Sequence, residues 1–528
     1  MTTWPSGQSV KYLGVHINMK LDWRDHWNYV KGMIKADMNI VNKRTISAAE
    51  ARYIINTKIG GTLMYSFQHI PFKDKDLEEM QQTFNSSIRA KVGLGGGVCN
   101  EMLMLDSDRL GLGLLDVKGM YYATKLTELY VKLNDQSVVG RMARHGLSKL
   151  QDKWRCEVQP LQYEELNEYR LYSEKNRGAN KYYMEAAHAA ALKTGVRIVS
   201  SASEHRNARQ TIMEAVDSIK HDDWTTLKPQ IESNGLVYID EITTYDEQME
   251  KWKMKDWGKL RLTNARQQTQ DTGWWSKLCG ILCGGSDEAI RHNIVTKVGL
   301  MDRRGYILPT EKVDMSSLMP SEIGGGEECV NASDGSATGQ GTPEAKAGYG
   351  VFVAKGPAIG DRERFGRLPS GTGHDNYEAE LMGIREGVRM NPLSTKVTHW
   401  TDSESAMKVL ERWPMLTHRQ KCMTTHGDII EAIYQGVARR AEHGGCYKVR
   451  WVKAHQDDDI AYEDLSEEAK WNVKADALAD RGREEEEVRE EWFGPGSGEY
   501  VMIGGGVRVC GNVRAHVKEK RKIEMWEE

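Results

Sequence analysis

The sequence lacks any apolar run that approaches the length of a membrane-spanning helix. Its N-terminus also lacks the charged-then-apolar pattern of a secretory signal. Neither sign of charge is in excess, because 72 basic and 76 acidic residues leave a net charge of −4. A surface that binds nucleic acid must therefore be local. We expect a soluble intracellular protein with no membrane partner, and the sequence does not separate a nuclear from a cytoplasmic location.

Cysteine is scarce, with eight residues scattered over 528 positions. This usage suits a reducing compartment better than a disulfide-stabilised scaffold. Cys279, Cys283 and His292 have a spacing found in zinc sites, but no convincing fourth ligand accompanies them. The sequence leaves open whether this cluster binds a metal.

Acidic residues in distinctive settings mark the C-terminal third of the chain. Asp334 ends a strand-like run, where we expect a turn to begin, and Asp402 ends a second apolar run. Glu380 and Asp476 lie within helix-like segments, and His455 follows a strand-like run. Carboxylates at strand ends and helix starts can converge at one edge of an α/β sheet. Divalent cations such as Mg²⁺ prefer such oxygen ligands.

The order of these motifs carries a resemblance to a known family. The motifs are Asp334-Gly335-Ser336, Glu380, Thr401-Asp402-Ser403, Val452-Lys453-Ala454-His455 and Asn472 followed by Asp476. This part of the chain resembles a type-1 ribonuclease H domain. The resemblance implies an α/β fold over residues 328–486, with a five-stranded mixed sheet and helices on both faces.

The same resemblance implies an active site. Its four metal-binding carboxylates would be Asp334, Glu380, Asp402 and Asp476, which would hold two Mg²⁺ ions for which Mn²⁺ can substitute. Glu380 is preferred to Glu378 because the family's glutamate directly precedes a large apolar residue. His455 would assist proton transfer or product departure.

The implied reaction is hydrolysis of the RNA strand of an RNA–DNA hybrid. Gly335, Ser336 and Asn376 match positions that contact the RNA strand in relatives, where 2′-hydroxyl groups distinguish RNA from DNA. A catalytically inert nucleic-acid-binding or structural remnant is the alternative. A DNA nuclease of related fold, such as an integrase, is a second alternative that the motif contexts disfavour.

Periodicity predicts the elements of this domain. Strands are expected at residues 328–333, 346–354, 361–368, 396–402 and 447–453. Helices are expected at residues 376–390, 403–413, 417–442 and 468–485. Within the third helix, basic residues could form a handle for the hybrid or simply a solvated face: Arg419, Lys421, Arg439 and Arg440.

Residues 1–96 are predicted to contain a buried strand at Val10–Ile17 and three helical segments, the second with a capping box at Ser47 and Glu50. The helical segments are expected at residues 24–42, 47–68 and 73–92. This part resembles the thumb-like region beyond the palm of retroelement reverse transcriptases. Because no Tyr/Phe-x-Asp-Asp turn precedes Val10, we do not expect this chain alone to polymerise DNA. It resembles the C-terminal part of a non-LTR-like retrotransposon polyprotein, and an upstream polymerase region is an expected partner.

Residues 97–327 are predicted to form a mainly helical connector, and residues 487–528 a hairpin followed by a charged helix. Cations and tryptophans alternate between residues 251 and 261. Such a stretch can grip phosphates and stack bases, or it can be a helix whose tryptophans face a core. Both interpretations stay open at this stage.

Overall fold

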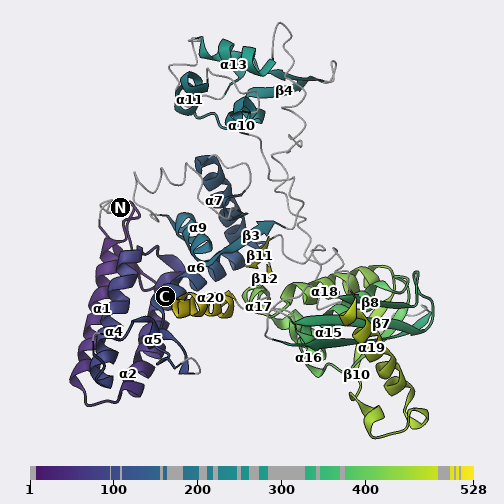
Figure 1. The fold of residues 1–528 in the computed structure, drawn as a ribbon. Helices are drawn as coiled ribbons and strands as arrows, with labels where there is room; N and C mark the ends of the chain where they lie inside the picture. The colour runs from purple at the N-terminus through teal and green to yellow at the C-terminus, as the bar shows by residue number, and fades with distance from the viewer. Residues whose placement is uncertain are drawn as a thin grey trace, which may run out of the picture.

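The computed structural model describes residues 8–95, 97–107, 110–154, 159–162, 182–200, 211–217, 224–246, 251–260, 273–283, 327–340, 345–368, 375–485, 500–504, 507–509 and 513–527. Figure 1 shows three groups of elements, which we call the helical body, the tryptophan group and the sheet region. Among the described helices, none combines the length and apolar character that crossing a bilayer requires.

The helical body is built from both ends of the chain. Its N-terminal elements are β1 (Val10–Tyr12), β2 (Val15–Ile17), α1 (Arg24–Lys43), α2 (Ala48–Ile54), the π-helix η1 (Ile55–Ile59), α3 (Gly60–His69), α4 (Asp74–Val92), α5 (Glu101–Met104), α6 (Val117–Leu133), α7 (Val138–Trp154), the 3₁₀ turn η3 (Pro160–Gln162), α9 (Tyr183–Thr194) and β3 (Val196–Ser200). Its C-terminal elements are β11 (Tyr500–Gly504), β12 (Val507–Arg508) and α20 (Val513–Glu527).

Amphipathic spacing explains how the helices of the body pack. On α1, Val30, Ile34, Met38 and Val41 recur every three or four residues and are all buried. The central helix α6 is buried on almost every side, as expected for a helix surrounded by others. The described helices at residues 24–43, 48–69 and 74–92 confirm the three predicted segments.

The C-terminal elements complete this body. Strand β11 pairs antiparallel with both β12 and β3, so the predicted hairpin is present and also joins a three-stranded sheet. Asn134 fixes the junction, since its side chain both donates to and accepts from the backbone of Tyr500 at 3.1 and 3.0 Å. Val513 and Val517 of α20 lie in the same core as α1 and α6. The chain therefore leaves the helical body, forms the other groups, and returns.

Two local details of the N-terminal part concern the predictions. The capping box of Ser47 and Glu50 is confirmed. The single buried strand at Val10–Ile17 is wrong: β1 and β2 form a two-stranded hairpin, and all three residues of β1 are exposed. Leu13 and Gly14 have positive φ and make the turn.

The tryptophan group has its own small core. Its elements are α10 (Ile212–Asp217), α11 (Trp224–Ser233), α12 (Ile239–Ile242), β4 (Thr243–Asp246), β5 (Lys251–Met254), the 3₁₀ turn η4 (Trp257–Lys259) and α13 (Trp274–Cys283). Trp257, Trp274 and Trp275 pack against one another in edge-to-face and tilted arrangements, with ring centroids 5.6–6.1 Å apart. The tryptophans thus serve a core, but the predicted helix around residue 251 is wrong, because β5 pairs with β4.

The possible zinc cluster falls partly in this group. Cys279 and Cys283 lie on α13 and are partly buried against the tryptophan core. His292 lies outside the described residues.

The sheet region alternates strands and helices as predicted. Its strands are β6 (Glu328–Thr338), β7 (Lys346–Lys355), β8 (Glu363–Arg367), β9 (Lys396–Thr401) and β10 (Cys446–Trp451). Its helical elements are α15 (Asn376–Arg389), α16 (Glu404–Arg412), η6 (Trp413–Met415), α17 (His418–Met423), α18 (Gly427–Glu442), η7 (Gln456–Asp458), η8 (Tyr462–Asp464) and α19 (Glu467–Glu484).

The five strands form a mixed sheet in the order β10-β9-β6-β7-β8. β6, β7 and β8 pair antiparallel, whereas β9 and β10 add parallel to β6. Gly383 of α15 approaches Ser333 on one face, and α19 lies against Gly348 and Gly350 on the other. A Cβ at Gly348 would lie 2.1 Å from the backbone of Arg483, so glycine permits this close packing.

Two predictions for this region are corrected. The turn expected at Asp334 is absent, because Asp334, Gly335 and Ser336 continue the ladder with β7 and the strand ends only at Thr338. The predicted helix at residues 417–442 is two helices, α17 and α18, separated at His426, whose φ of 54° is left-handed.

The predicted basic handle has other partners in this structure. Arg440 is fully buried and donates to the carbonyl oxygens of Pro392 and Val388. Arg419 pairs with Glu128 of α6 at 2.6 Å. These two guanidinium groups therefore act within the protein, and Arg419 links the sheet region to the helical body.

Candidate active site

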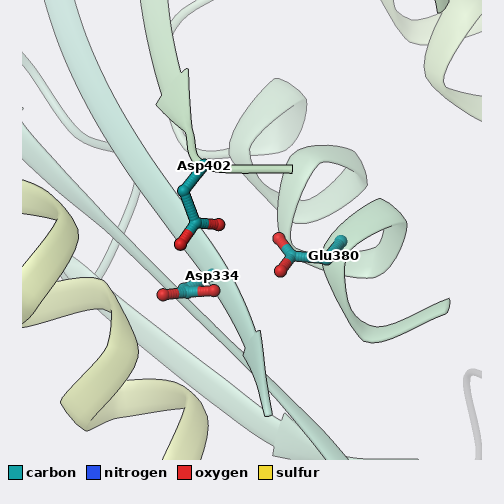
Figure 2. A group of neighbouring side chains, drawn as sticks. All are labelled: Asp334, Glu380 and Asp402. Carbon is teal, nitrogen blue, oxygen red and sulfur yellow. The ribbon is translucent and has the colours of Figure 1, made fainter. Parts of the chain in front are cut away.

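Three carboxylates converge beside the end of β9. Asp334 projects from β6, Glu380 from the first half of α15, and Asp402 from the residue that follows β9 (Figure 2). One oxygen from each lies within 4.8 Å of the others. We call these three residues the acidic cluster. Three of the four predicted metal-binding carboxylates are thus brought together from three separate elements.

A close approach between β6 and α15 sets the spacing of Asp334 and Glu380. A Cβ at Gly335 would lie 2.6 Å from the backbone nitrogen of Glu380 and 2.9 Å from the Cβ of Ala379. Only glycine allows the strand and the helix to come so close. The N–H of Gly335 also donates to Asp334 Oδ1 at 2.7 Å.

Burial and mutual repulsion perturb the two innermost carboxyl groups. Asp334 is 5% exposed and Glu380 is 4% exposed. Burial raises the pKa of Asp334 well above its usual range, and the charge of Asp402 raises it further. Burial also raises the pKa of Glu380 well above its usual range, with the charges of Asp334 and Asp402 adding to the effect. The cluster therefore favours any cation that can neutralise it.

Asp402 is held by neighbours on two elements. Asn472 Nδ2 of α19 donates to Asp402 Oδ2 at 3.2 Å, and the indole N–H of Trp451 donates to the Asp402 carbonyl oxygen at 2.9 Å. Burial raises the pKa of Asp402, while the hydrogen bond from Asn472 and the charge of His455 oppose that rise. Thr401 lies 3.4 Å from Glu380 Oε2 and connects the two sides of the cluster.

The fourth predicted carboxylate lies at the margin of the cluster. Asp476 is half-buried on α19, and its charge raises the pKa of Asp334. Burial raises the pKa of Asp476 itself, and the charges of Asp480 and Asp402 add to the rise. Its helix places it one turn after Asn472, so α19 offers both side chains to the same edge of the sheet.

His455 lies on the connection between β10 and α19. It has a left-handed φ of 48° and is exposed at the start of η7. Its charge lowers the pKa of both Asp402 and Asp476. The structure therefore places the predicted histidine on the exposed side of the carboxylates.

The predicted substrate contacts have partners within the protein. Ser336 is 8% exposed and donates to Asp480 at 2.6 Å. Asn376 lies 3.4 Å from Glu380 Oε1, and the amide of Gly335 faces the acidic cluster. Contact with substrate by these three residues stays a prediction.

Sequence reasoning assigned no role to three residues that hold the cluster: Thr401, Trp451 and Asn472. A signal existed for Asn472, which stands four residues before Asp476 on a helix. The preference for Glu380 over Glu378 agrees with the geometry, because the side chain of Glu378 lies beside His426 instead, 3.4 Å away.

The acidic cluster fits a hard divalent cation. All of its donors are carboxylate oxygens, which Mg²⁺ and Mn²⁺ prefer over soft metals. Two of the carboxyl groups are buried against one another, and a bound cation would relieve their repulsion. Within the described residues, no other group of this kind is present.

One comparison with known families matches the part of the chain that contains the acidic cluster. Residues 327–484 match the family model described as RNase H. Among solved structures, LC9-RNase H1, described as a type 1 RNase H with the type 2 active-site motif, is 22% identical, with 30% of this chain and 73% of that chain covered and a TM-score of 0.23.

Two foamy virus structures are also similar to this chain. The RNase H domain of PFV is 22% identical, with 30% of this chain and 96% of that chain covered and a TM-score of 0.22. The foamy viral protease-reverse transcriptase in complex with RNA/DNA hybrid is 14% identical, with 42% and 28% covered and a TM-score of 0.21. No curated protein matches the chain.

Proposed function

We propose that the sheet region is a metal-dependent endonuclease that hydrolyses the RNA strand of RNA–DNA hybrids. The observation that carries the proposal is the acidic cluster, whose three carboxylates lie within 4.8 Å in a segment that matches the RNase H family model. Asp334, Glu380 and Asp402 would hold one Mg²⁺ or Mn²⁺ ion, and Asp476 would help to hold a second. When bound, such ions stabilise charge on the phosphate oxygens and lower the pKa of water.

Neighbouring hydrogen-bond donors would orient the carboxylates for metal binding. The amide of Gly335 and the side chain of Asn472 donate to carboxylate oxygens and fix their orientation. Because these donors belong to backbone or to a packed helix, little reorganisation is needed when substrate binds. His455, exposed beside Asp402 and Asp476, would move a proton or assist the departure of product.

The retroelement context forms part of the same proposal. Residues 1–96 would act as a thumb-like part, residues 97–327 as a connector and residues 487–528 as a C-terminal extension. An upstream polymerase region would then be a partner that supplies hybrid to the nuclease. The inert remnant is the competing proposal, and only turnover separates the two.

The test is cleavage of an end-labelled RNA–DNA hybrid by the full chain with Mg²⁺ or Mn²⁺. We expect cuts within the RNA strand, leaving 3′-hydroxyl and 5′-phosphate ends. Asp334→Asn should abolish them, because it removes a charge from the centre of the cluster. Asp464→Asn makes the same chemical change at an exposed position and should leave the rate unchanged.

Three results would count against the proposal. Wild-type protein that binds the hybrid without cutting it would favour the inert remnant. Cutting of duplex DNA in preference to the hybrid would favour an integrase-like nuclease. Cleavage that survives Asp334→Asn would place the active site elsewhere.

A further inference from the structure

A large apolar groove is lined by residues of β10, α16 and α18, together with Trp400 of β9. Its volume is about 780 Å³, within the roughly 300–1,000 Å³ typical of ligand sites. Most of its wall is aliphatic or aromatic, including Met407, Leu410, Ile433, Val437, Tyr447 and Val449. Trp451 also lines the groove and is 46% exposed, and its indole N–H is held by the hydrogen bond to the Asp402 carbonyl oxygen. The wall is therefore formed before any partner arrives.

The strand beside this groove has an open edge. β10 is the last strand of its sheet. Cys446 N–H donates to Thr395 and Val452 N–H donates to Thr401, which places these amides toward β9. Since successive residues of a strand alternate in direction, the amides of Tyr447, Val449 and Trp451 point to the open side. The side chains of the same three residues line the groove.

The other face of β10 is basic. Lys448 and Arg450 also border the groove, but along the strand they alternate with Tyr447, Val449 and Trp451, so their side chains lie on the opposite face, and both are exposed. Within the described part of the chain, neither takes part in a salt bridge. Glu411, the acidic residue of the groove, belongs to the α16 wall. A partner strand would therefore meet positive charge on one face, and an apolar wall with one negative charge on the other.

We propose that β10 binds an extended peptide that adds to the sheet as a further strand. The peptide would alternate apolar residues, which enter the groove, with acidic residues, which face Lys448 and Arg450. Backbone hydrogen bonds to the open edge provide affinity in such complexes, and the alternating side chains provide specificity. The acidic residues must lie on the face away from Glu411, so the alternation itself is part of the recognition.

A second copy of this chain is a poorer occupant. Pairing β10 with another β10 would bring Lys448 and Arg450 of both copies onto one face, and like charges on neighbouring strands repel. Exposed lysine and arginine on an edge strand also discourage unwanted pairing. The charge pattern of β10 thus disfavours pairing with β10 of a second copy and favours pairing with an acidic strand.

The test uses the full chain and a short synthetic peptide in which valine and phenylalanine alternate with glutamate. Calorimetry should show saturable binding, and hydrogen exchange should show protection confined to a fragment that contains residues 446–452. A peptide with lysine in place of glutamate should not bind. N-methylation of the strand-facing amides of the acidic peptide keeps its side chains and should abolish binding.

Matched variants locate the site. Arg450→Glu should weaken binding about tenfold, because it replaces a surface attraction with a repulsion. Arg412→Glu makes the same change on α16 at a position that does not line the groove, and should have no effect.

Other outcomes would overturn the proposal. Equal binding of the N-methylated peptide would show that the groove takes side chains or small amphiphiles without strand addition. Protection of residues 446–452 by RNA–DNA hybrid alone would assign this edge to nucleic acid. Protection that rises with protein concentration and ignores the peptide would indicate pairing between copies.

Discussion

The helical body and the sheet region use their interiors differently. Most of the core of the body is one apolar cluster to which residues from both ends of the chain contribute, with a small second cluster on α7. The sheet region divides its apolar residues between the two faces of the sheet and places buried carboxylates at its edge. Burying Asp334 and Glu380 together opposes folding, as their raised pKa values indicate. The body also buries charge, since Lys125 of α6 is fully buried. Within the described residues, however, only the sheet region gathers carboxylates where a cation can bind.

The largest expected effect comes from a substitution that destabilises the helical body alone. Val517→Asp places a charge at a fully buried position of α20 and should destabilise the body by about 3 kcal/mol or more. We expect an early thermal transition in circular dichroism while hybrid cleavage persists at low temperature. Ala515→Asp, on the exposed side of the same helix, is the control. Loss of cleavage in step with the first transition would show that the sheet region depends on the body.

Glycine substitutions in the two regions should have opposite effects on stability. Gly335→Ala forces β6 and α15 apart and should lower stability by about 1–3 kcal/mol, with cleavage reduced because Asp334 and Glu380 separate. Gly61→Ala lies on α3, where a Cβ meets nothing within 4 Å, and should raise stability by about 0.5–1 kcal/mol. Chemical denaturation measures both. Equal effects of the two changes would mean that the close approach of β6 and α15 does not require glycine at position 335.

The two regions also differ in what could be predicted from the sequence. In the sheet region, apolar periodicity located each strand and helix to within a few residues, apart from the extension of β6 beyond Asp334 and the break at His426. The first exception has no local signal, because Asp334-Gly335-Ser336 is typical of a turn until β7 pairs with it. The second has one, since Gly427 directly follows His426, but apolar periodicity alone runs through it. The order of the motifs predicted three carboxylates that the structure brings within 4.8 Å.

The return of the C-terminus to the body was beyond sequence reasoning. Pairing between β11 and β3 joins segments that are distant in the chain, and local patterns carry no information about such a partner. The polar residues that orient Asp402 were also not predicted, because Asn472 and Trp451 acquire that role only when α19 and β10 converge.

The pH dependence of stability tests whether the acidic cluster destabilises the sheet region. Because the folded protein holds protons on Asp334 and Glu380 more tightly than the unfolded chain does, protonation stabilises it. That stability is fully present below about pH 4, near the unfolded pKa values, and is lost as pH rises through the raised folded-state values. Without metal, unfolding of the sheet region should become easier by about 1.4 kcal/mol per pH unit for each extra proton held.

A bound cation and the substitution Asp334→Asn should each weaken the dependence of stability on pH. Mg²⁺ or Mn²⁺ should stabilise the charged carboxylates, and Asp334→Asn should remove one titrating group, so denaturation midpoints should then vary less with pH. If neither the cation nor Asp334→Asn changes the slope of stability against pH, the cluster does not determine the stability of this region.

The smallest expected effect is that of Asn472→Ala, which tests whether Asn472 orients Asp402 or adjusts its pKa. Asn472→Ala removes the hydrogen bond to Asp402 that opposes the upward effect of burial on its pKa, so that pKa should rise further. Cleavage at neutral pH should fall about fivefold, equivalent to about 1 kcal/mol, while the rate at alkaline pH should approach that of wild type. A pH–rate profile measures both limbs. A uniform loss at every pH would mean that Asn472 positions Asp402 without tuning its charge, and the difference between the two regions would then lie in geometry more than in electrostatics.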